Sequence, residues 1–286
     1  MELPKNRREF AKAIATVGAA RLLFPGTLRA ASKTNASKRL LLFDGKTLNG
    51  WHPMPRILPS HFPDYEESKV DHAKWTIENG VLSGGQNPPG CGLGGWLLSD
   101  EKYGDFELTL DAKPDWSIDT GIYIRTTDAG AGFQVLLDHR DGGAIGFIYG
   151  KNIGGFHARP YDFWPERNEK GEVIGLIPKD VEEKDRIPMD YAIAADRFLK
   201  TWKFGDWNTF KIRCVGKYPV ITTWINGVKI CQLDTGTLTG HQYDREKTAA
   251  LLGREGRIAF EVHAGTEVRW AKDALCRWKN ISLVRL

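Results

Sequence analysis

Short runs in which apolar and polar residues alternate recur along this chain, and they constrain the fold more than any other feature. A period of two residues is typical of strands that bury one face. The dipeptides Asn79-Gly80, Asp141-Gly142 and Asn226-Gly227 lie between apolar runs and tolerate the positive φ angles of tight hairpins. The pattern predicts an all-β protein with mainly antiparallel ladders. Strands are expected at residues 40–43, 75–82, 106–112, 121–126, 133–138, 144–149, 209–215, 220–225, 257–262 and 280–285.

So many strands predict two packed sheets. Helical patterns are confined to residues 192–200 and 245–252, the latter preceded by Asp244 as an N-cap, and we expect both helices to decorate the sandwich. With 41% hydrophobic residues the chain can fill a core. The alternation predicts that this core includes Phe106, Leu108, Ile122, Ile124, Val135, Leu137, Ile212, Ile258, Phe260 and Val262.

The net charge of +4 comes from the first 36 residues, where seven basic side chains face two acidic ones. The rest of the chain therefore carries about one negative charge, which gives it no general attraction for phosphate backbones or anionic lipid. We expect no nucleic-acid partner. No apolar run reaches the roughly 18 residues of a membrane span, so no transmembrane span is expected either.

The basic leader has the order of an export signal. Arg7-Arg8-Glu9-Phe10 precedes a weakly apolar run and then small residues at Ala30 and Ala31. This order resembles a twin-arginine signal, although an ordinary basic amphipathic N-terminus remains an alternative. We therefore expect residues 1–37 to be signal and linker, residues 38–286 to be the mature domain, and the protein to be periplasmic or extracellular.

The stretch 151–206 interrupts the strand pattern with Gly, Pro, aromatic and charged residues. Connections of this length are usually functional or disordered, and this one contains too many aromatic residues for a disordered tether. We expect an ordered loop excursion over one face of the sandwich, bordering the site. The four cysteines form no CxxC pair, which argues against zinc-ribbon and thioredoxin chemistry and favours buried free thiols.

Several segments, in order, resemble the 3-keto-disaccharide hydrolase domain family. The segments are LLFDGKTLNGW (41–51), WTIENGVLSGG (75–85), YGDFELTLDAK (103–113), TGIYIR (120–125), GDWNTFKIRC (205–214), TTWINGVKI (222–230) and the closing RWKNISLVRL. The resemblance implies a concanavalin A-like jelly-roll sandwich that is exported by bacteria and acts on glycosides oxidised at C3. A carbohydrate is therefore the expected substrate.

Alternation also indicates which side chains share a face. If the apolar residues of strands 121–126, 133–138 and 257–262 point into the core, the intervening residues point outward. This outward set, a base candidate with carboxylates, a cation and an aromatic ring, consists of Tyr123, Arg125, Gln134, Asp138, Glu261 and His263.

A 3-keto sugar can be cleaved by elimination, because the carbonyl acidifies the hydrogen on C2. Such a reaction needs a base, a proton donor and an electrophile at the keto oxygen. We assign His263 as the base and Arg125, or a bound divalent cation, as the electrophile. Glu261, Asp138 and Gln134 are expected to orient hydroxyls or hold the cation. His157 is a reserve base, and Tyr123, Trp96 and Trp164 are expected to bind the sugar.

Other interpretations of these residues stay open. Arg125 can form a surface ion pair, His263 and Asp138 can be turn residues, and a tryptophan in a sandwich is often part of the core. The sequence shows no metal-ligand spacing and no GxSxG, HExxH or P-loop motif. A non-catalytic carbohydrate-binding sandwich remains the alternative function, and it would not require His263.

Overall fold

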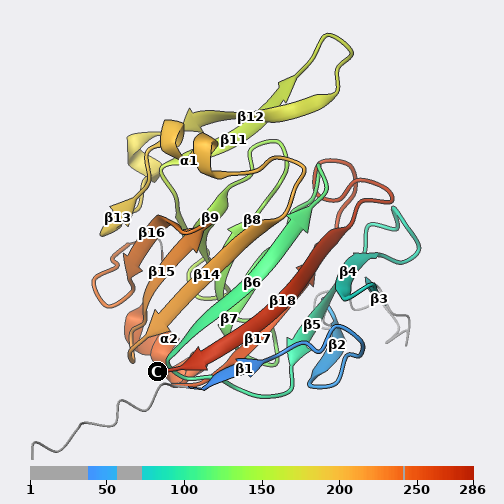
Figure 1. The fold of residues 1–286 in the computed structure, drawn as a ribbon. Coiled ribbons are helices and arrows are strands. Elements are labelled where there is room, and N and C mark those ends of the chain that lie inside the picture. Colours follow the sequence, from blue (N-terminus) through green and yellow to red (C-terminus); the bar gives the residue numbers. More distant parts are fainter. Residues whose placement is uncertain (1–37, 57–72, 241) are drawn as a thin grey trace, which may run out of the picture. The chain divides into compact units, whose positions relative to one another are not determined.

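Two antiparallel sheets lie one behind the other in the computed structural model, which describes residues 38–56, 73–240 and 242–286 (Figure 1). The expected signal and linker, residues 1–37, lie outside the described residues. Among the described residues the larger sheet has nine strands. In spatial order these are β13 (Tyr191–Ala192), β16 (Val228–Asp234), β15 (Val220–Ile225), β14 (Asn208–Val215), β6 (Phe106–Pro114), β18 (Cys276–Arg285), β4 (Val81–Gln86) and β3 (Ala73–Glu78), with β1 (Arg39–Leu41) also paired to β18.

The smaller sheet has seven strands and lies behind the larger one in Figure 1. Its strands, in spatial order, are β10 (His157–Ala158), β9 (Ile145–Lys151), β8 (Gly132–Leu137), β7 (Gly121–Thr126), β17 (Arg257–Val262), β5 (Gly95–Ser99) and β2 (Trp51–Pro55). The expected all-β, concanavalin A-like jelly-roll sandwich of two antiparallel sheets is confirmed.

Tight turns join neighbouring strands where the sequence predicted them. Asn79 and Gly80 both have positive φ angles, 51° and 78°, and join β3 to β4. The strand expected at 75–82 is therefore two strands separated by this turn. Asn226-Gly227 joins β15 to β16 in the same way, with φ angles of 50° and 81°.

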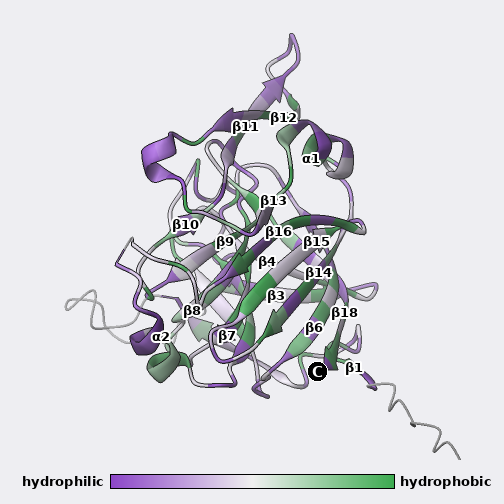
Figure 2. Ribbon diagram, turned by 90° about the vertical axis from the view of Figure 1, so that its left-hand side faces the viewer, coloured by the Kyte–Doolittle hydropathy of each residue, from purple (hydrophilic) through white to green (hydrophobic). Residues whose placement is uncertain are grey.

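The excursion at 151–206 is ordered, as expected, but it is not a simple loop. It contains the hairpin of β11 (Tyr161–Arg167) and β12 (Val173–Asp180), a 3-10 turn at Glu183–Asp185, the short strands β10 and β13, and helix α1 (Ala195–Thr201). The β11–β12 hairpin extends beyond both sheets in Figures 1 and 2, whose views differ by 90°. Its strands were missed because Pro165, Pro178 and many charged residues hide the alternation.

Side chains from the inner faces of both sheets fill the space between them. All ten residues predicted for the core are fully buried there. Three of the four cysteines, Cys214, Cys231 and Cys276, are buried, and all four are free thiols, as expected.

The second helix, α2 (Arg245–Leu252), lies where the sequence predicted it. The Asp244 carboxylate accepts hydrogen bonds from the backbone N–H groups of Glu246 and Lys247, both 3.0 Å long, and this N-cap satisfies donors that a helix start leaves free. Among the described residues, no helix is long and apolar enough to cross a membrane.

Candidate active site

Five of the predicted site residues lie on one face of the smaller sheet: Tyr123, Gln134, Glu261, Trp96 and His157. Asp138 and His263 directly follow strands of this sheet, Trp164 lies on the separate β11–β12 hairpin, and Arg125 points elsewhere. Residues that lie directly opposite each other in antiparallel strands share a face. One such row crosses four strands and consists of Tyr123 (β7), Gln134 (β8), Tyr149 (β9) and His157 (β10). On the neighbouring pair of strands, Glu261 of β17 lies opposite Trp96 of β5.

Glu261 is a fully buried carboxylate held by two donors. The Tyr123 hydroxyl donates a hydrogen bond of 2.8 Å to Oε2, and Nε of Arg56 donates to Oε1. Burial alone would raise the pKa of Glu261, but attraction to Arg56, attraction to His263 when its ring is protonated and the hydrogen bond from Arg56 outweigh it and lower the pKa. Glu261 is therefore ionised, and it fixes a cation and a phenol on this face.

A small apolar cluster, separate from the main core, surrounds the Tyr123 ring. It consists of Trp96, Leu98, Tyr123 and Ala259, with Met54 packed against it. The Trp96 ring meets Tyr123 edge to face at 4.4 Å between centroids, and only 2% of Trp96 is exposed. Trp96 therefore supports Tyr123 in this structure, and its contact with a sugar stays a prediction.

Gln134 lies next to this pair because Gly121 leaves room for it. A Cβ atom on Gly121 would lie 2.4 Å from Cγ of Gln134, so only glycine fits there. The Gln134 amide donates a 3.1 Å hydrogen bond to the carbonyl of Thr120 and is almost fully buried.

A second group of buried acidic residues, Asp119 and Asp138, lies where loops meet at one end of the sheet, and we call it the acidic pair. Asp119 precedes β7, and its Oδ2 accepts a 3.0 Å hydrogen bond from Nε of Arg140 and another bond from Arg269. Burial would raise the pKa of Asp119, but attraction to His263 when its ring is protonated, attraction to Arg140 and Arg269 and a hydrogen bond from Asp138 outweigh burial and lower it. Asp119 is therefore the ionised carboxyl of the pair that it forms with Asp138.

Asp138 is in the opposite state. Burial and the negative charge of Asp119 raise its pKa well above the usual range, despite attraction to Arg140. Asp138 is therefore a protonated carboxylic acid that donates to the Asp119 carboxylate. Its Oδ1 is buried and has no hydrogen-bond partner among the described residues. The sequence placed Asp138 at an outward surface, whereas the structure buries it.

His263 follows β17 directly and faces this acidic pair. Its Nδ1 bonds to the carbonyl of Ala264, which can only accept, so Nδ1 carries the proton of the neutral ring. Nε2 is then the basic nitrogen, and it lies 4.0 Å from Oδ2 of Asp119. Burial lowers the pKa of His263 against the attraction of Glu261 and Asp119, which keeps the ring neutral at neutral pH.

The sequence predicted that Arg125 lies beside these residues, and this prediction is wrong. Arg125 has a positive φ angle of 50°, and the register between β7 and β17 shifts next to it, so the alternation breaks. Its side chain is buried, and it donates to Asp105 at 2.7 Å and to the carbonyl of Gly104 at 3.0 Å.

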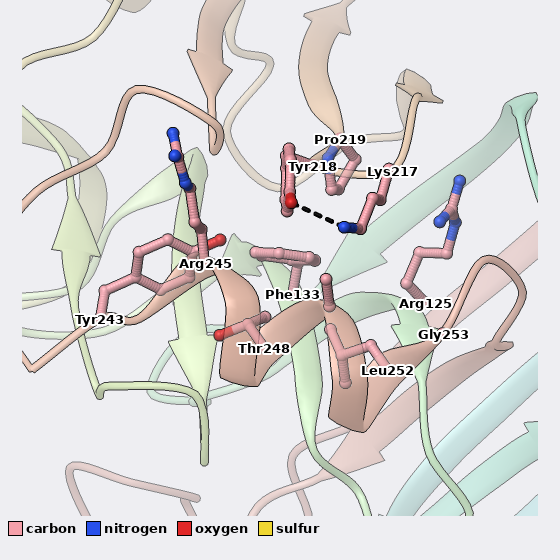
Figure 3. A pocket seen from close by; sticks show the side chains of 11 residues that line it. Arg125, Phe133, Lys217, Tyr218, Pro219, Tyr243, Arg245, Thr248, Leu252 and Gly253 are labelled. Atoms are coloured by element: carbon pink, nitrogen blue, oxygen red, sulfur yellow. Dashed lines mark hydrogen bonds between the residues drawn. The ribbon is translucent and has the colours of Figure 1, made fainter.

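Figure 3 shows Arg125 at the edge of a crevice beside α2, together with Lys217 and Tyr218. This crevice of about 10 Å³ has room for one water molecule at most. Arg125 therefore pairs at the edge of the sandwich and does not contribute to the candidate active site.

His157 and Trp164 border a groove at the other side of the row. The His157 ring packs against Tyr149 at 4.3 Å between centroids, and burial with repulsion from Arg159 lowers its pKa to about 4. Trp164 is 42% exposed on the β11–β12 hairpin. Both residues line an open groove of about 440 Å³.

The sequence missed the residues that supply most of the positive charge here. Arg56, Arg140 and Arg269 come from irregular segments, and so does Asp119. Alternation assigns faces only within strands, so it gives no information on loop residues. The chain segment Asp138-His139-Arg140 was the one indication of these residues in the sequence, because Asp138 and Arg140 both interact with Asp119.

The divalent cation considered as an alternative electrophile does not fit these residues. Among the described residues, no group of three His, Cys, Asp or Glu side chains is placed to hold a metal ion. The carboxylates on this face are already neutralised by arginines, since Glu261 pairs with Arg56 and Asp119 with Arg140 and Arg269. A dication would be repelled by these guanidinium groups.

Comparison with known proteins gives matches to carbohydrate-active proteins. The model of the 3-keto-alpha-glucoside-1,2-lyase-like domain family matches residues 39–284. A 3-keto-disaccharide hydrolase of Bacteroides thetaiotaomicron is 28% identical over 183 residues, which are 62% of this chain. The match spans 53% of that relative, about half its length.

Solved structures of similar fold have lower sequence identity. A Parabacteroides distasonis protein named provisionally as a glycosyl hydrolase is 19% identical, with a TM-score of 0.46, over 87% of this chain and 100% of that one. The Bacillus licheniformis beta-glucanase is 10% identical, with a TM-score of 0.41, over 89% of this chain and 100% of that one.

Proposed function

Starting from the fact that the chain belongs to the 3-keto-alpha-glucoside-1,2-lyase-like domain family, we propose that it cleaves 3-keto-glycosides by elimination and then adds water. The observation that carries this proposal is the pairing of a neutral, basic His263 with a protonated Asp138 across Asp119. One group can accept a proton while the other donates one, as elimination requires. The family description names a lyase and the relative's name a hydrolase, and elimination followed by hydration accounts for both.

His263 is the base in this proposal. The ketone at C3 makes the hydrogen on C2 acidic, and Nε2 of His263 removes it as a proton. The electron pair of the C2–H bond then spreads onto the keto oxygen as an enolate. A neutral imidazole is suited to this step, because its unperturbed pKa near 6.5 leaves it free to accept a proton at neutral pH.

Arg56 takes the role that the sequence gave to Arg125. The enolate oxygen needs a fixed donor or positive charge. A guanidinium has five N–H donors, so the bond from Nε of Arg56 to Glu261 leaves donors for the keto oxygen. Glu261 is then a positioning residue, since it holds Arg56 and Tyr123 in place.

Asp138 donates the second proton. As the enolate collapses, a C1–C2 double bond forms, the C1–O bond breaks, and the leaving oxygen takes the proton of Asp138. Protonated His263 returns its proton to the carboxyl pair through Asp119, which lies 4.0 Å from Nε2. Water then adds a hydroxyl to C1 and a proton to C2, so the overall reaction is hydrolysis.

Purified protein incubated with a 3-keto-glycoside tests the proposal, with the released sugar measured over time. The His263→Ala variant should lose about 10²-fold or more in turnover while it remains folded. His52→Ala is a matched control, since His52 lies on β2 of the same sheet and pairs with Asp100 on the surface. Equal turnover of the parent and His263→Ala would rule out His263 as the base.

If the parent protein turns over no 3-keto-glycoside but binds oligosaccharides, the binding-module interpretation replaces this proposal. Calorimetry with unoxidised disaccharides distinguishes the two, because a binding module keeps its affinity when His263 is replaced.

We also propose that the protein is exported through its leader. The charge excess of the first 36 residues and the order Arg7-Arg8-Glu9-Phe10 support this. Replacement of both arginines by lysine should trap the precursor in the cytoplasm, as fractionation and immunoblotting would show. Unchanged export of this variant would indicate a different type of signal.

A further inference from the structure

Lys151, the last residue of β9, is a half-buried lysine that makes no hydrogen bond and no ion pair with any other described residue. The arginines nearby differ from it, because each of them contacts Glu261 or Asp119. Removing an unpaired charge from water costs free energy, and ionisable groups held in such surroundings cluster at functional sites.

The strand register places Lys151 on the face that carries the candidate active site. Lys151 lies opposite Gly132 of β8, and two residues before it Tyr149 lies opposite Gln134. Side chains two residues apart on a strand share a face, so Lys151 shares the face of Tyr149 and Gln134. Gly132 has no side chain, and Arg125 of β7 turns away from this face. Lys151 therefore provides a cation on the part of the face where alternation predicted Arg125.

The charged neighbours of Lys151 belong to the candidate active site. Burial lowers the pKa of Lys151 most, and repulsion from Arg56 and Arg269 lowers it further. Attraction to Glu261 and Asp119 raises the pKa but offsets only part of this effect. Since the influence of one charge on another falls with distance and with screening by water, the ammonium lies near these side chains.

The described residues around Glu261 and Asp119 carry a surplus of positive charge. The four cations are Arg56, Arg140, Arg269 and Lys151, and only two carboxylates, Glu261 and Asp119, are ionised, which leaves a surplus of two. Fixed positive charge in a site that excludes water stabilises negative charge that develops during a reaction. The oxygen of an enolate acquires such a charge.

We propose that Lys151 is a catalytic residue whose ammonium donates a hydrogen bond to the keto oxygen at C3, beside Arg56. The assignment rests on the proposed function, because it takes His263 to remove the proton from C2. The electron pair of the C2–H bond moves onto the keto oxygen, and the hydrogen bond from Nζ strengthens as that oxygen becomes negative. The charge leaves the oxygen when the C1–O bond breaks. Nζ keeps its proton throughout, so Lys151 stabilises the enolate and is unchanged by the reaction.

Cleavage of a 3-keto-glycoside by four proteins tests this role. The proteins are the parent, Lys151→Met, Lys151→Arg and Lys211→Met. Lys211 is a matched control, since it is a half-buried lysine of the larger sheet whose Nζ lies 4.1 Å from the centroid of the Trp224 ring. Lys151→Met should lower kcat about 10²-fold with little change in KM, as expected when an oxyanion loses one donor. Lys151→Arg should keep most of the turnover, and Lys211→Met should keep all of it.

The pH profile gives a second readout, which a merely structural role would not change. Because the pKa of Lys151 is lowered from 10.5, the turnover of the parent should begin to fall below that pH as the ammonium loses its proton. The pKa values of the Tyr123 and Tyr149 phenols on the same face are raised, and Arg56 and Arg269 stay charged. In Lys151→Arg the alkaline fall should therefore move to higher pH.

Full turnover of Lys151→Met, or a loss confined to KM, would overturn the assignment while the cleavage by the parent stands. Borohydride reduction that links the sugar to Lys151 would indicate a covalent imine and would overturn it as well. If Lys151→Met does not fold, the pH profile of Lys151→Arg decides, and an alkaline fall at the same pH as in the parent would contradict the role. A parent that cleaves no 3-keto-glycoside would contradict the proposed function, and this role with it.

Discussion

Glu261 and Asp138 are both buried carboxyl groups at the same sheet, yet they hold opposite charge states. Glu261 meets Arg56 and the Tyr123 hydroxyl, and these donors lower its pKa in spite of full burial. Asp138 meets the carboxylate of Asp119, so burial and repulsion act in the same direction and raise its pKa. The neighbours, and not burial, determine which carboxyl carries a charge.

This difference assigns different work to the two residues. An ionised group with two fixed donors holds other side chains in position, whereas a neutral acid can give up a proton. Two carboxyls whose environments separate their pKa values are a known pattern of acid–base sites. The comparison therefore supports Glu261 as a positioning residue and Asp138 as the proton donor.

Glu261→Gln should have the larger effect on stability. The substitution leaves the Arg56 guanidinium without its charged partner in a mostly buried position, where its side chain is 15% exposed. Loss of one partner of a buried ion pair costs about 3 to 5 kcal/mol. Urea denaturation measures this free energy of unfolding, and a loss below about 1 kcal/mol would contradict the ionised state of Glu261.

Asp138→Asn should spare the fold and impair the reaction. A neutral amide replaces a neutral acid of similar shape and can still donate a hydrogen bond to Asp119, so the variant should be at least as stable as the parent at neutral pH. Turnover of a 3-keto-glycoside should fall by about 10²-fold, as expected when a general acid is lost. A variant with full turnover would show that Asp138 donates no proton.

The same variant should change how stability depends on pH. The folded protein keeps Asp138 protonated, whereas the unfolded chain ionises it near the ordinary value of 3.8, so folding binds a proton above that pH. This contribution to stability is complete below pH 3.8 and is lost as the pH rises toward the folded pKa. The stability of Asp138→Asn relative to the parent should therefore increase with pH. A constant difference from pH 4 to pH 8 would contradict the assignment.

His139 gives a smaller test, because it isolates the effect of burial. Its ring packs against Trp116 and Phe204, each 5.0 Å away between centroids, and burial outweighs the hydrogen bond with the Asp115 carbonyl and lowers its pKa to about 4. The ring should therefore stay neutral until about pH 4 in an NMR titration. Protonation near the ordinary value of 6.5 would show that the ring is not sealed from water.

Strand alternation and turn dipeptides predicted most of the fold. Strands 121–126, 220–225 and 257–262 have the predicted bounds, and the predicted core is buried. The short strands β2 and β5 were missed. In β5 every residue is buried, so its sequence, Gly-Trp-Leu-Leu-Ser, has no polar alternation to detect.

The candidate site was predictable only where a regular strand carried it. Tyr123, Gln134 and Glu261 share a face because their strands keep a period of two. Arg125 failed the same reasoning because a bulge and a positive φ angle reverse its direction, which alternation cannot anticipate. The arginines that complete the site come from loops, whose approach depends on the folded topology.

Cleavage in D₂O is the most direct test of the central claim, that the bond breaks by elimination with His263 as the base. The parent protein is incubated with a 3-keto-disaccharide, the reaction is quenched early, and the released 3-keto sugar is analysed by mass spectrometry and NMR against an enzyme-free control. Elimination and hydration predict one deuterium at C2 of the product, and much slower formation of that product with His263→Ala. A cleaved sugar that keeps its original hydrogen at C2 would contradict the account.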